Sequence, residues 1–303
     1  MKTESDRYDA DGLQMIGHFA YDENDSKKRP GVLVFPEAFG LGDHAKKRAE
    51  RIAAELGYAA MACDLRGEQK VIGEIEQVMA LLQPLRTQAA KVRARTVNAL
   101  KALTARPQVD ISRVAAIGFC FGGTMTYELA LTGADIKAAV GFHSGLQVTS
   151  PGDAKQIKAK VLALLGADDP SIPAESREAF GKMLSEGGVD WQITVYGGVV
   201  HSFTNEKADR FGAPRLRPLR RQSRRTLLET DERPVQGGPR VGRTSHRQTP
   251  SSRSHGPALA RKNGEISRKH GNALIPILLE ALWRALCCWM RRQREPRRYA
   301  VAA

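Results

Sequence analysis

The chain reads Gly118-Phe119-Cys120-Phe121-Gly122-Gly123 directly after an apolar run at residues 114–117. The spacing is that of G-x-S-x-G, a sharp strand-to-helix turn that exposes a nucleophile, with Cys in the place of Ser. Small residues flank the nucleophile in such a turn because side chains at those positions would collide. A packed cysteine at an ordinary strand–helix junction is the alternative interpretation of Cys120. The sequence downstream decides between the two.

Two further strand ends carry the partners that such a nucleophile needs. Residues 161–165 are a short apolar run typical of a buried strand, and the loop after them holds Asp168 and Asp169. Residues 191–196 alternate in the manner of a strand and are followed by His201. Each acid could instead cap a helix. Nucleophile, acid and histidine nevertheless occur in the chain order of a catalytic triad, and each follows a strand, where parallel sheets form ligand crevices.

The rest of the first two thirds alternates strand and helix patterns. Strands are expected at residues 32–36, 59–63, 114–118, 138–142, 161–165 and 192–196, and helices at 44–56, 84–105, 123–131 and 173–186. Alternation of this kind predicts an α/β fold, a mostly parallel sheet with helices on both faces. We expect it to occupy residues 1–212.

Four motifs together resemble the dienelactone hydrolase family, which is carboxymethylenebutenolidase-like and belongs to the α/β-hydrolase superfamily. They are FPEAFG at 35–40, GFCFGG at 118–123, DPSIP at 169–173 and HSFTN at 201–205. The match runs over about residues 11–212 and keeps the order and rough spacing of the motifs. The resemblance implies an α/β-hydrolase fold and a carboxylic ester or lactone hydrolase.

The resemblance also implies a Cys-His-Asp triad. Cys120 would be the nucleophile, His201 the general base and Asp169 the acid that orients the base. Asp169 is preferred to Asp168 because only Asp169 satisfies the family pattern D-x-x-[V/I]-P. A thiol needs a nearby base or a helix N-terminus to ionise at neutral pH, and Cys120 would have both. A thioester would form first, and His201 would then activate the water that hydrolyses it.

Further roles follow from the same resemblance. Glu37 would match the family's additional carboxylate, which helps to generate the thiolate when substrate binds. The backbone amides of Ala38 and Phe121 would form the oxyanion hole. Ser202 stands where the prototype enzyme has a serine that helps to hold the substrate carboxylate. The matching arginine of the prototype has no clear counterpart in this sequence.

Other classes of protein find less support. The four cysteines show no metal-type spacing, so we expect no metal and no cofactor, and we expect a reducing, cytoplasmic compartment. Residues 1–11 lack the apolar core of a signal peptide, and no apolar run is long enough to span a membrane. A thiol redox protein would need a resolving cysteine, for which Cys63 is the candidate. The expected partner is a small-molecule ester or lactone.

The C-terminal third is different in composition. Residues 1–205 hold 24 basic and 25 acidic residues, whereas residues 206–303 hold 23 basic and 8 acidic residues. We expect residues 213–303 to be an Arg-rich, largely disordered tail with an apolar helix at about 275–290. Clustered arginines can neutralise phosphates, so nucleic-acid binding by this tail is the alternative function; an anchor on an anionic membrane surface is a second alternative.

We favour a third interpretation of the tail, namely a frameshift. Codons can be chosen for residues 228–236 that, read one nucleotide later, encode WKLMKDLF, which resembles the family's final helix. The fold would then lack its usual final helix. The nucleotide sequence tests this hypothesis.

Overall fold

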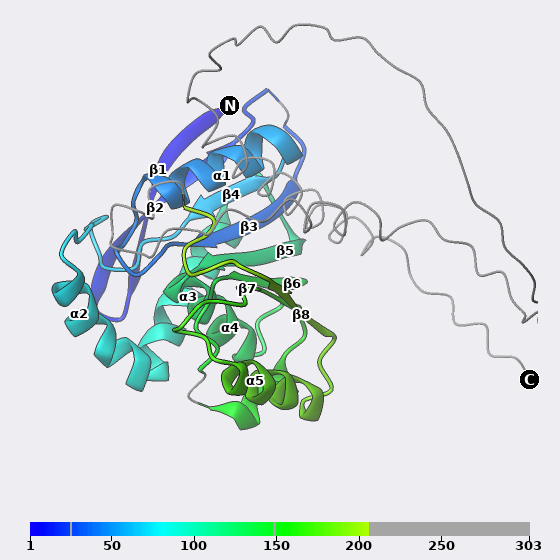
Figure 1. Cartoon of the computed structure of the whole chain (residues 1–303). Coiled ribbons are helices and arrows are strands. Elements are labelled where there is room, and N and C mark those ends of the chain that lie inside the picture. Colours follow the sequence, from blue (N-terminus) through cyan, green and yellow to red (C-terminus); the bar gives the residue numbers. More distant parts are fainter. Residues whose placement is uncertain (25, 148–149, 206–303) are drawn as a thin grey trace, which may run out of the picture.

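A computed structural model describes residues 1–24, 26–147 and 150–205. The elements are β1 (Lys2–Ala10), β2 (Leu13–Tyr21), β3 (Arg29–Phe35), α1 (Asp43–Leu56), β4 (Ala59–Ala62), α2 (Ile75–Thr87), α3 (Ala89–Ala105), β5 (Val109–Phe119), α4 (Phe121–Leu131), β6 (Ala138–Phe142), the short 3₁₀ helix η1 (Pro151–Gln156), β7 (Lys160–Gly166), α5 (Ala174–Glu186) and β8 (Trp191–Tyr196) (Figure 1). The expectations for the tail, the apolar helix at 275–290 and the missing final helix lie outside the described residues.

The strands form one mostly parallel sheet in the order β1-β2-β4-β3-β5-β6-β7-β8. β3 pairs in parallel with β4 and β5, and β5 to β8 continue the parallel arrangement. Only β2 pairs antiparallel, with β1 and with β4, among the described strands. The order and the crossovers are consistent with an α/β-hydrolase fold.

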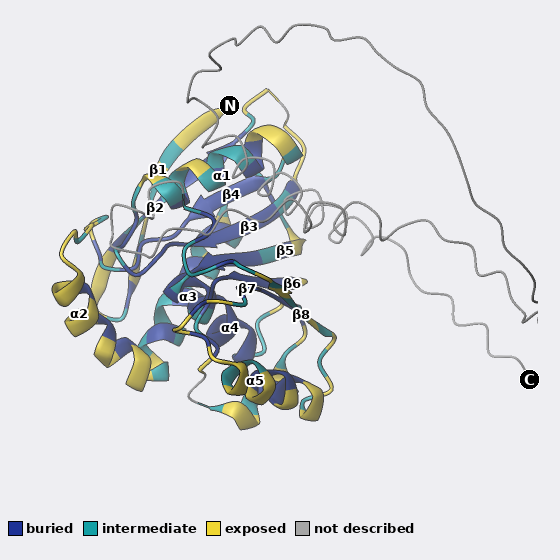
Figure 2. Cartoon of the chain, viewed as in Figure 1, coloured by how far each residue is buried: buried dark blue, intermediate teal, exposed yellow. Residues whose placement is uncertain are grey.

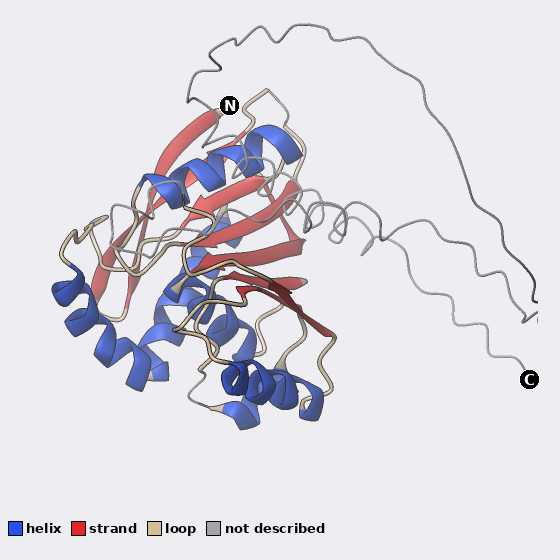
Figure 3. Ribbon diagram, in the orientation of Figure 1, coloured by secondary structure: helices blue, strands red, loops and turns tan. Residues whose placement is uncertain are grey.

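Helices cover the sheet on both faces because its central strands are apolar on both sides. Along β3, Val32 and Val34 pack with the buried side of α1, while Leu33 and Phe35 face the opposite cluster, to which α3, α4 and α5 contribute. Figure 3 shows these helices below the sheet with α1 above it. The central strands are largely buried, except for the exposed N-terminal half of β5, whereas the outer helix surfaces are exposed (Figure 2).

All six predicted strands form, as β3 to β8, but two strands and most of one helix were not predicted. The single helix expected over 84–105 covers the whole of α3 but only the last four residues of α2, and the two helices meet at Gln88; residues 75–83 of α2 were not expected to be helical. Pro84 lies inside α2, and the carbonyl of Pro84 accepts the Gln88 amide at 3.0 Å. Residues 2–10, whose polarity hid a strand, form the edge strand β1 with alternating burial, and residues 13–21 form β2; neither strand was predicted.

Among the described residues, no helix combines the length and the apolar content needed to cross a bilayer.

Candidate active site

Cys120 sits between the end of β5 and the start of α4, in a backbone conformation that is costly for a residue with a side chain. Its φ is 55° and its ψ is −120°. Such strain persists only where the surroundings hold it, and it clusters at functional sites. The Cys120 amide donates to the Phe142 carbonyl at 3.0 Å, and the Cys120 carbonyl accepts the Gly123 amide at 3.1 Å. The side chain is partly exposed, whereas the second described cysteine, Cys63, is buried.

The glycines around Cys120 are required by close backbone approach. A methyl group at Gly118 would overlap the Gly122 carbonyl, and one at Gly122 would overlap the carbonyls of Phe35 and Pro36. The turn therefore lies directly against the end of β3. This contact places the first residues of α4 beside the loop that begins at Glu37.

Asp169 and His201 form a short, oriented pair at the ends of β7 and β8. His201 Nδ1 lies 2.7 Å from Asp169 Oδ2. The other carboxylate oxygen of Asp169 accepts the Ser171 amide at 2.9 Å and the Ser171 hydroxyl at 2.6 Å. Burial raises the pKa of Asp169, but its contacts with His201 and Ser171 outweigh burial and lower the pKa overall. Asp168, by contrast, is exposed to solvent.

The imidazole of His201 connects the acid to the cysteine. Burial alone would lower its pKa, but hydrogen bonds to Asp169 and to Cys120 outweigh burial and raise the pKa to about 10. That value corresponds to an imidazolium that faces two acidic partners. The structure therefore brings Cys120, His201 and Asp169 together in the chain order that the sequence predicted.

Glu37 is buried at the start of the loop after β3, where Asn205 Nδ2 donates to its Oε2 at 2.7 Å. Burial raises the pKa of Glu37, and this effect exceeds the opposing effects of Asn205 and the nearby cations. His44 Nδ1 lies 3.9 Å from the same carboxylate oxygen. In the described part of the chain, Glu37 makes no hydrogen bond to Cys120.

The two amides expected to form an oxyanion hole belong to the start of α4 and to the loop after β3. Phe121 is the first residue of α4, so its amide has no partner inside the helix. Ala38 is buried in the loop after β3, beside which Gly122 packs. The expected substrate ligand Ser202 is partly exposed and has a φ of 57°. Its carbonyl accepts the Asn205 amide at 2.9 Å.

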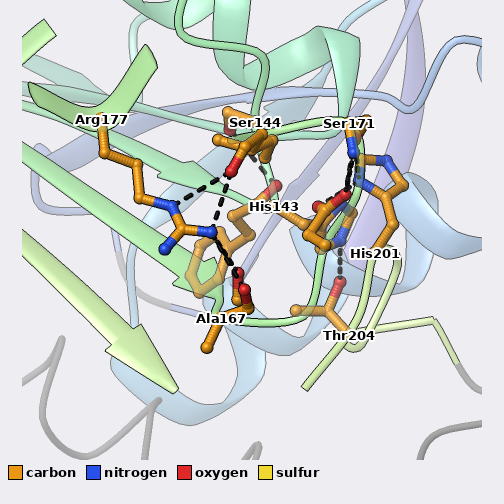
Figure 4. Close-up of polar contacts among 11 residues, drawn as sticks. His143, Ser144, Ala167, Ser171, Arg177, His201 and Thr204 are labelled. Atoms are coloured by element: carbon orange, nitrogen blue, oxygen red, sulfur yellow. Dashed lines mark hydrogen bonds and ion pairs between the residues drawn. The ribbon is translucent and has the colours of Figure 1, made fainter. Parts of the chain in front are cut away.

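His143 is a residue of the site that sequence reasoning missed. It directly follows β6 and is fully buried, with its Nε2 2.8 Å from the Thr204 hydroxyl oxygen (Figure 4). Its ring centroid lies 5.0 Å from that of His201 at an interplanar angle of 67°. Burial and the nearby charge of His201 hold the pKa of His143 well below its usual value, so the ring is neutral. Its position just past an apolar run was the signal that could have identified it.

The backbone of the histidine loop is anchored to α1. The Thr204 carbonyl accepts a hydrogen bond from Arg48 Nη2 at 2.8 Å and lies 3.3 Å from His44 Nε2. Burial lowers the pKa of His44 to about 3, so the ring is neutral and can donate only from one nitrogen. These contacts hold the segment that follows His201 against the rest of the site.

The loop that carries Asp169 is held by Arg177 of α5. Its guanidinium donates to the carbonyls of Gly166 at 3.3 Å and Ile172 at 2.9 Å. It also donates to the Ala167 carbonyl at 3.1 Å (Figure 4). These three carbonyls bracket Asp169 in the sequence. Within the described residues, no group of three His, Cys, Asp or Glu side chains is placed to hold a metal ion.

Comparison with known proteins gives consistent similarities. The model of the dienelactone hydrolase family matches residues 16–221. A dienelactone hydrolase-like promiscuous phosphotriesterase from metagenomic libraries has a solved structure with 44% identity, covering 71% of this chain and 90% of that chain, with a TM-score of 0.67. The solved structure of the protein m3DLH also shows 44% identity, covering 75% of this chain and 95% of that chain, with a TM-score of 0.69. A candidate carboxymethylenebutenolidase of Escherichia coli (strain K12) is 30% identical over 204 residues, which cover 63% of this chain and 74% of the relative.

Proposed function

This chain belongs to the dienelactone hydrolase family, and we propose that it hydrolyses a carboxylic ester or lactone through the thiolate of Cys120. The observation that carries the proposal is the hydrogen-bonded pair of His201 and Asp169, 2.7 Å apart, next to a cysteine held at a φ of 55°. A strained turn that exposes a thiol beside an oriented imidazole is the arrangement that nucleophilic catalysis requires.

In the first half of the reaction, the Cys120 sulfur attacks the substrate carbonyl carbon. The proton of the thiol passes to His201, whose charge Asp169 stabilises. The negative oxygen of the tetrahedral intermediate accepts hydrogen bonds from the Ala38 and Phe121 amides; in a hydrolase, one such donor contributes about 3–4 kcal/mol. The intermediate collapses, the bond from carbon to the leaving oxygen breaks, and His201 returns the proton to that oxygen.

In the second half, water replaces the alcohol. His201 removes a proton from a water molecule, and the resulting hydroxide attacks the carbonyl carbon of the thioester. The carbon–sulfur bond breaks, the carboxylic acid leaves, and the Cys120 thiolate is restored beside the imidazolium. The raised pKa of His201 supports the imidazolium half of this pair, because it favours the protonated ring.

Glu37 and Ser202 have supporting roles in this proposal. Burial raises the pKa of Glu37, so its carboxylate can accept a proton more readily than an exposed one. We assign to it the assistance of thiolate formation. Ser202 follows the base directly and is partly exposed, and we assign to its hydroxyl a contact with the substrate.

The test is to trap the acylated cysteine. The purified chain is mixed with p-nitrophenyl acetate, quenched in acid within the burst, and digested for peptide mapping. We expect one acetyl group on Cys120 and turnover on a panel of dienelactones and p-nitrophenyl esters. Acetyl on another residue, or equal turnover by Cys120→Ala, contradicts the proposal.

A side activity on phosphotriesters is a second candidate. The observation that favours it is the 44% identity to a relative described as a promiscuous phosphotriesterase, 90% of which is covered. Hydrolysis of paraoxon that disappears in Cys120→Ala is the expected result. The alternative of nucleic-acid binding rests on residues outside the described ones, and the comparisons give it no support.

A further inference from the structure

The loop after β4 lies along the loop that carries Ala38. The Ile72 amide donates to the Phe39 carbonyl at 2.9 Å, and Gly40 forms an antiparallel bridge with Val71. The approach is so close that a methyl group at Gly40, whose φ is 107°, would overlap the Lys70 carbonyl. Residues 64–72 therefore form one wall of the loop that follows β3.

Arg66 makes the charged contact between these two loops. Its Nη2 donates to the Ala38 carbonyl oxygen at 2.7 Å. On the other side of Ala38, the Glu37 carbonyl accepts the Gly40 amide at 3.1 Å. The Glu37 carbonyl and the Ala38 amide belong to the same peptide unit, so the peptide units on both sides of the Ala38 Cα are held. A guanidinium–carbonyl bond is charge-assisted and stronger than a bond between neutral groups.

The loop that presents Arg66 is itself built around a buried carboxylate. Asp64 is 1% exposed and accepts four backbone amides, those of Ile16 at 3.1 Å, Arg66 at 2.9 Å, Gly67 at 3.1 Å and Gln69 at 2.7 Å. One of the four comes from β2 and three come from the loop, so the carboxylate ties the loop to the sheet.

The same loop contains two strained residues in succession. Glu68 has a φ of 54° and Gln69 a φ of 57°, a conformation that non-glycine residues rarely adopt. Strain of this kind persists where surrounding contacts fix the backbone, as the Asp64 carboxylate does here. The side chain of Arg66 therefore extends from a loop whose backbone is fixed by hydrogen bonds to Asp64.

From these contacts we propose that Arg66 is a positioning residue, which holds the Ala38 carbonyl and thereby aims the Ala38 amide at the oxyanion. The inference rests on the proposed function, in which Ala38 donates to the tetrahedral intermediate. Arg66 acts through Ala38 and does not touch the reacting atoms. This role gives a reason for the close contacts between residues 64–72 and the loop after β3.

The experiment separates the oxyanion hole from the nucleophile by using two reactions of Cys120. Acylation by p-nitrophenyl acetate passes through an oxyanion, whereas alkylation by iodoacetamide does not. Burst kinetics give the acylation rate, and mass mapping of the Cys120 peptide over a range of pH gives the alkylation rate. The variants are Arg66→Gln and Arg66→Lys, with Arg113→Gln as the control, since Arg113 is exposed and lies in the N-terminal half of β5, at the strand end opposite Cys120.

For Arg66→Gln we expect acylation slower by about tenfold or more, because displacing one donor by a fraction of an ångström weakens its contact in the transition state. The alkylation rate, its pH profile and KM stay as in the wild type. Arg66→Lys keeps one charged donor and should recover part of the acylation rate. Arg113→Gln should match the wild type in both reactions.

Acylation by Arg66→Gln within twofold of the wild-type rate overturns the inference. Parallel slowing of alkylation also overturns it, because Arg66 would then act on the thiolate, and a rise in KM alone would make it a substrate ligand. If Arg66→Gln does not fold, Arg66→Lys carries the same comparison. Failure of the proposed function is distinguishable, since Cys120→Ala would then retain turnover.

Discussion

Asn205 donates a hydrogen bond to Glu37 at 2.7 Å and thereby joins the end of the histidine loop to the loop after β3. These residues are 168 positions apart in the chain. The bond holds the carboxylate of Glu37 in a buried position, where its pKa is raised. Any movement of the histidine loop would therefore change the environment of Glu37.

Glu37→Gln should lower activity without abolishing it. Glutamine can still accept the Asn205 hydrogen bond through its carbonyl oxygen, so the loops stay joined, but it carries no carboxylate to assist the formation of the thiolate. We expect the burst phase with p-nitrophenyl acetate to slow by about tenfold or more, in the range of general-base effects, with deacylation changed less. Unchanged acylation would make Glu37 a structural acid of the loop.

Cys120→Ala should abolish hydrolysis while the fold stays intact, because it removes only the sulfur of a partly exposed side chain and keeps the β-carbon that packs against the core. The activity of Cys120→Ser should be far lower than that of the wild type, since a hydroxyl needs a stronger base to ionise than a thiol does. Turnover with p-nitrophenyl esters and the melting temperature are the measurements. More than a small residual activity in Cys120→Ala would contradict the nucleophile assignment.

Cys63 offers a matched control within the same molecule. It is fully buried, and burial raises its pKa, so it stays a neutral thiol. Iodoacetamide should therefore modify Cys120 much faster than Cys63 in the folded protein. Cys63→Ala should lose stability through lost packing but keep the acetylation of Cys120.

Stability should depend on pH through His201. Its pKa in the folded protein is about 10, above the usual value of about 6.5. The stabilisation is therefore complete below about pH 6.5 and is lost as the pH rises toward 10. The melting temperature of the wild type should exceed that of His201→Gln most at the lower pH, and the difference should shrink over this window.

A second comparison isolates the contribution of Cys120 to this effect. In Cys120→Ala, His201 loses one of the two partners that raise its pKa. The stabilisation by the protonated ring should therefore be lost at a lower pH than in the wild type. Titration of the His201 ring by NMR measures the pKa directly. An equal pKa in both proteins would show that Asp169 alone sets it.

The sequence predicted the parallel sheet well because apolar runs between helical patterns are a strong signal. It also placed Cys120, Asp169 and His201 at three strand ends, which the fold brings together; their catalytic roles remain predictions. β1 was missed because an edge strand exposed on one side reads as a polar segment. The helix expected over 84–105 ran across the break at Gln88 and left out residues 75–83 of α2, and β2 was missed as well.

The residues that support the site were harder to predict than the triad. Arg66, Arg177 and Asp64 act mainly on backbone groups, and such contacts leave no pattern of residue types at a fixed spacing. His143 follows a strand end, as the triad members do, but no expected order of residues pointed to it. Partnerships of this kind become visible only when the chain is folded.

Arg177 gives the last prediction. Its guanidinium contacts the carbonyls of Gly166, Ala167 and Ile172, which lie on both sides of Asp169. Arg177→Met should leave these carbonyls without their charged donor, and we expect a loss of about 2–3 kcal/mol in the free energy of unfolding, the range for a few non-additive hydrogen bonds to a charged group. Activity should fall with it, because a displaced Asp169 no longer orients His201.

The matched control is Lys182→Gln on the same helix, whose side chain is 74% exposed and whose ion pair with Glu186 at 3.8 Å is a surface contact. It should change the free energy of unfolding by less than about 0.5 kcal/mol. Urea unfolding gives the stability of both variants, and the pH profile of kcat reports the orientation of His201. A loss of stability in Arg177→Met with an unchanged kcat profile would limit Arg177 to a structural role, because the acid loop would then keep Asp169 in place without it.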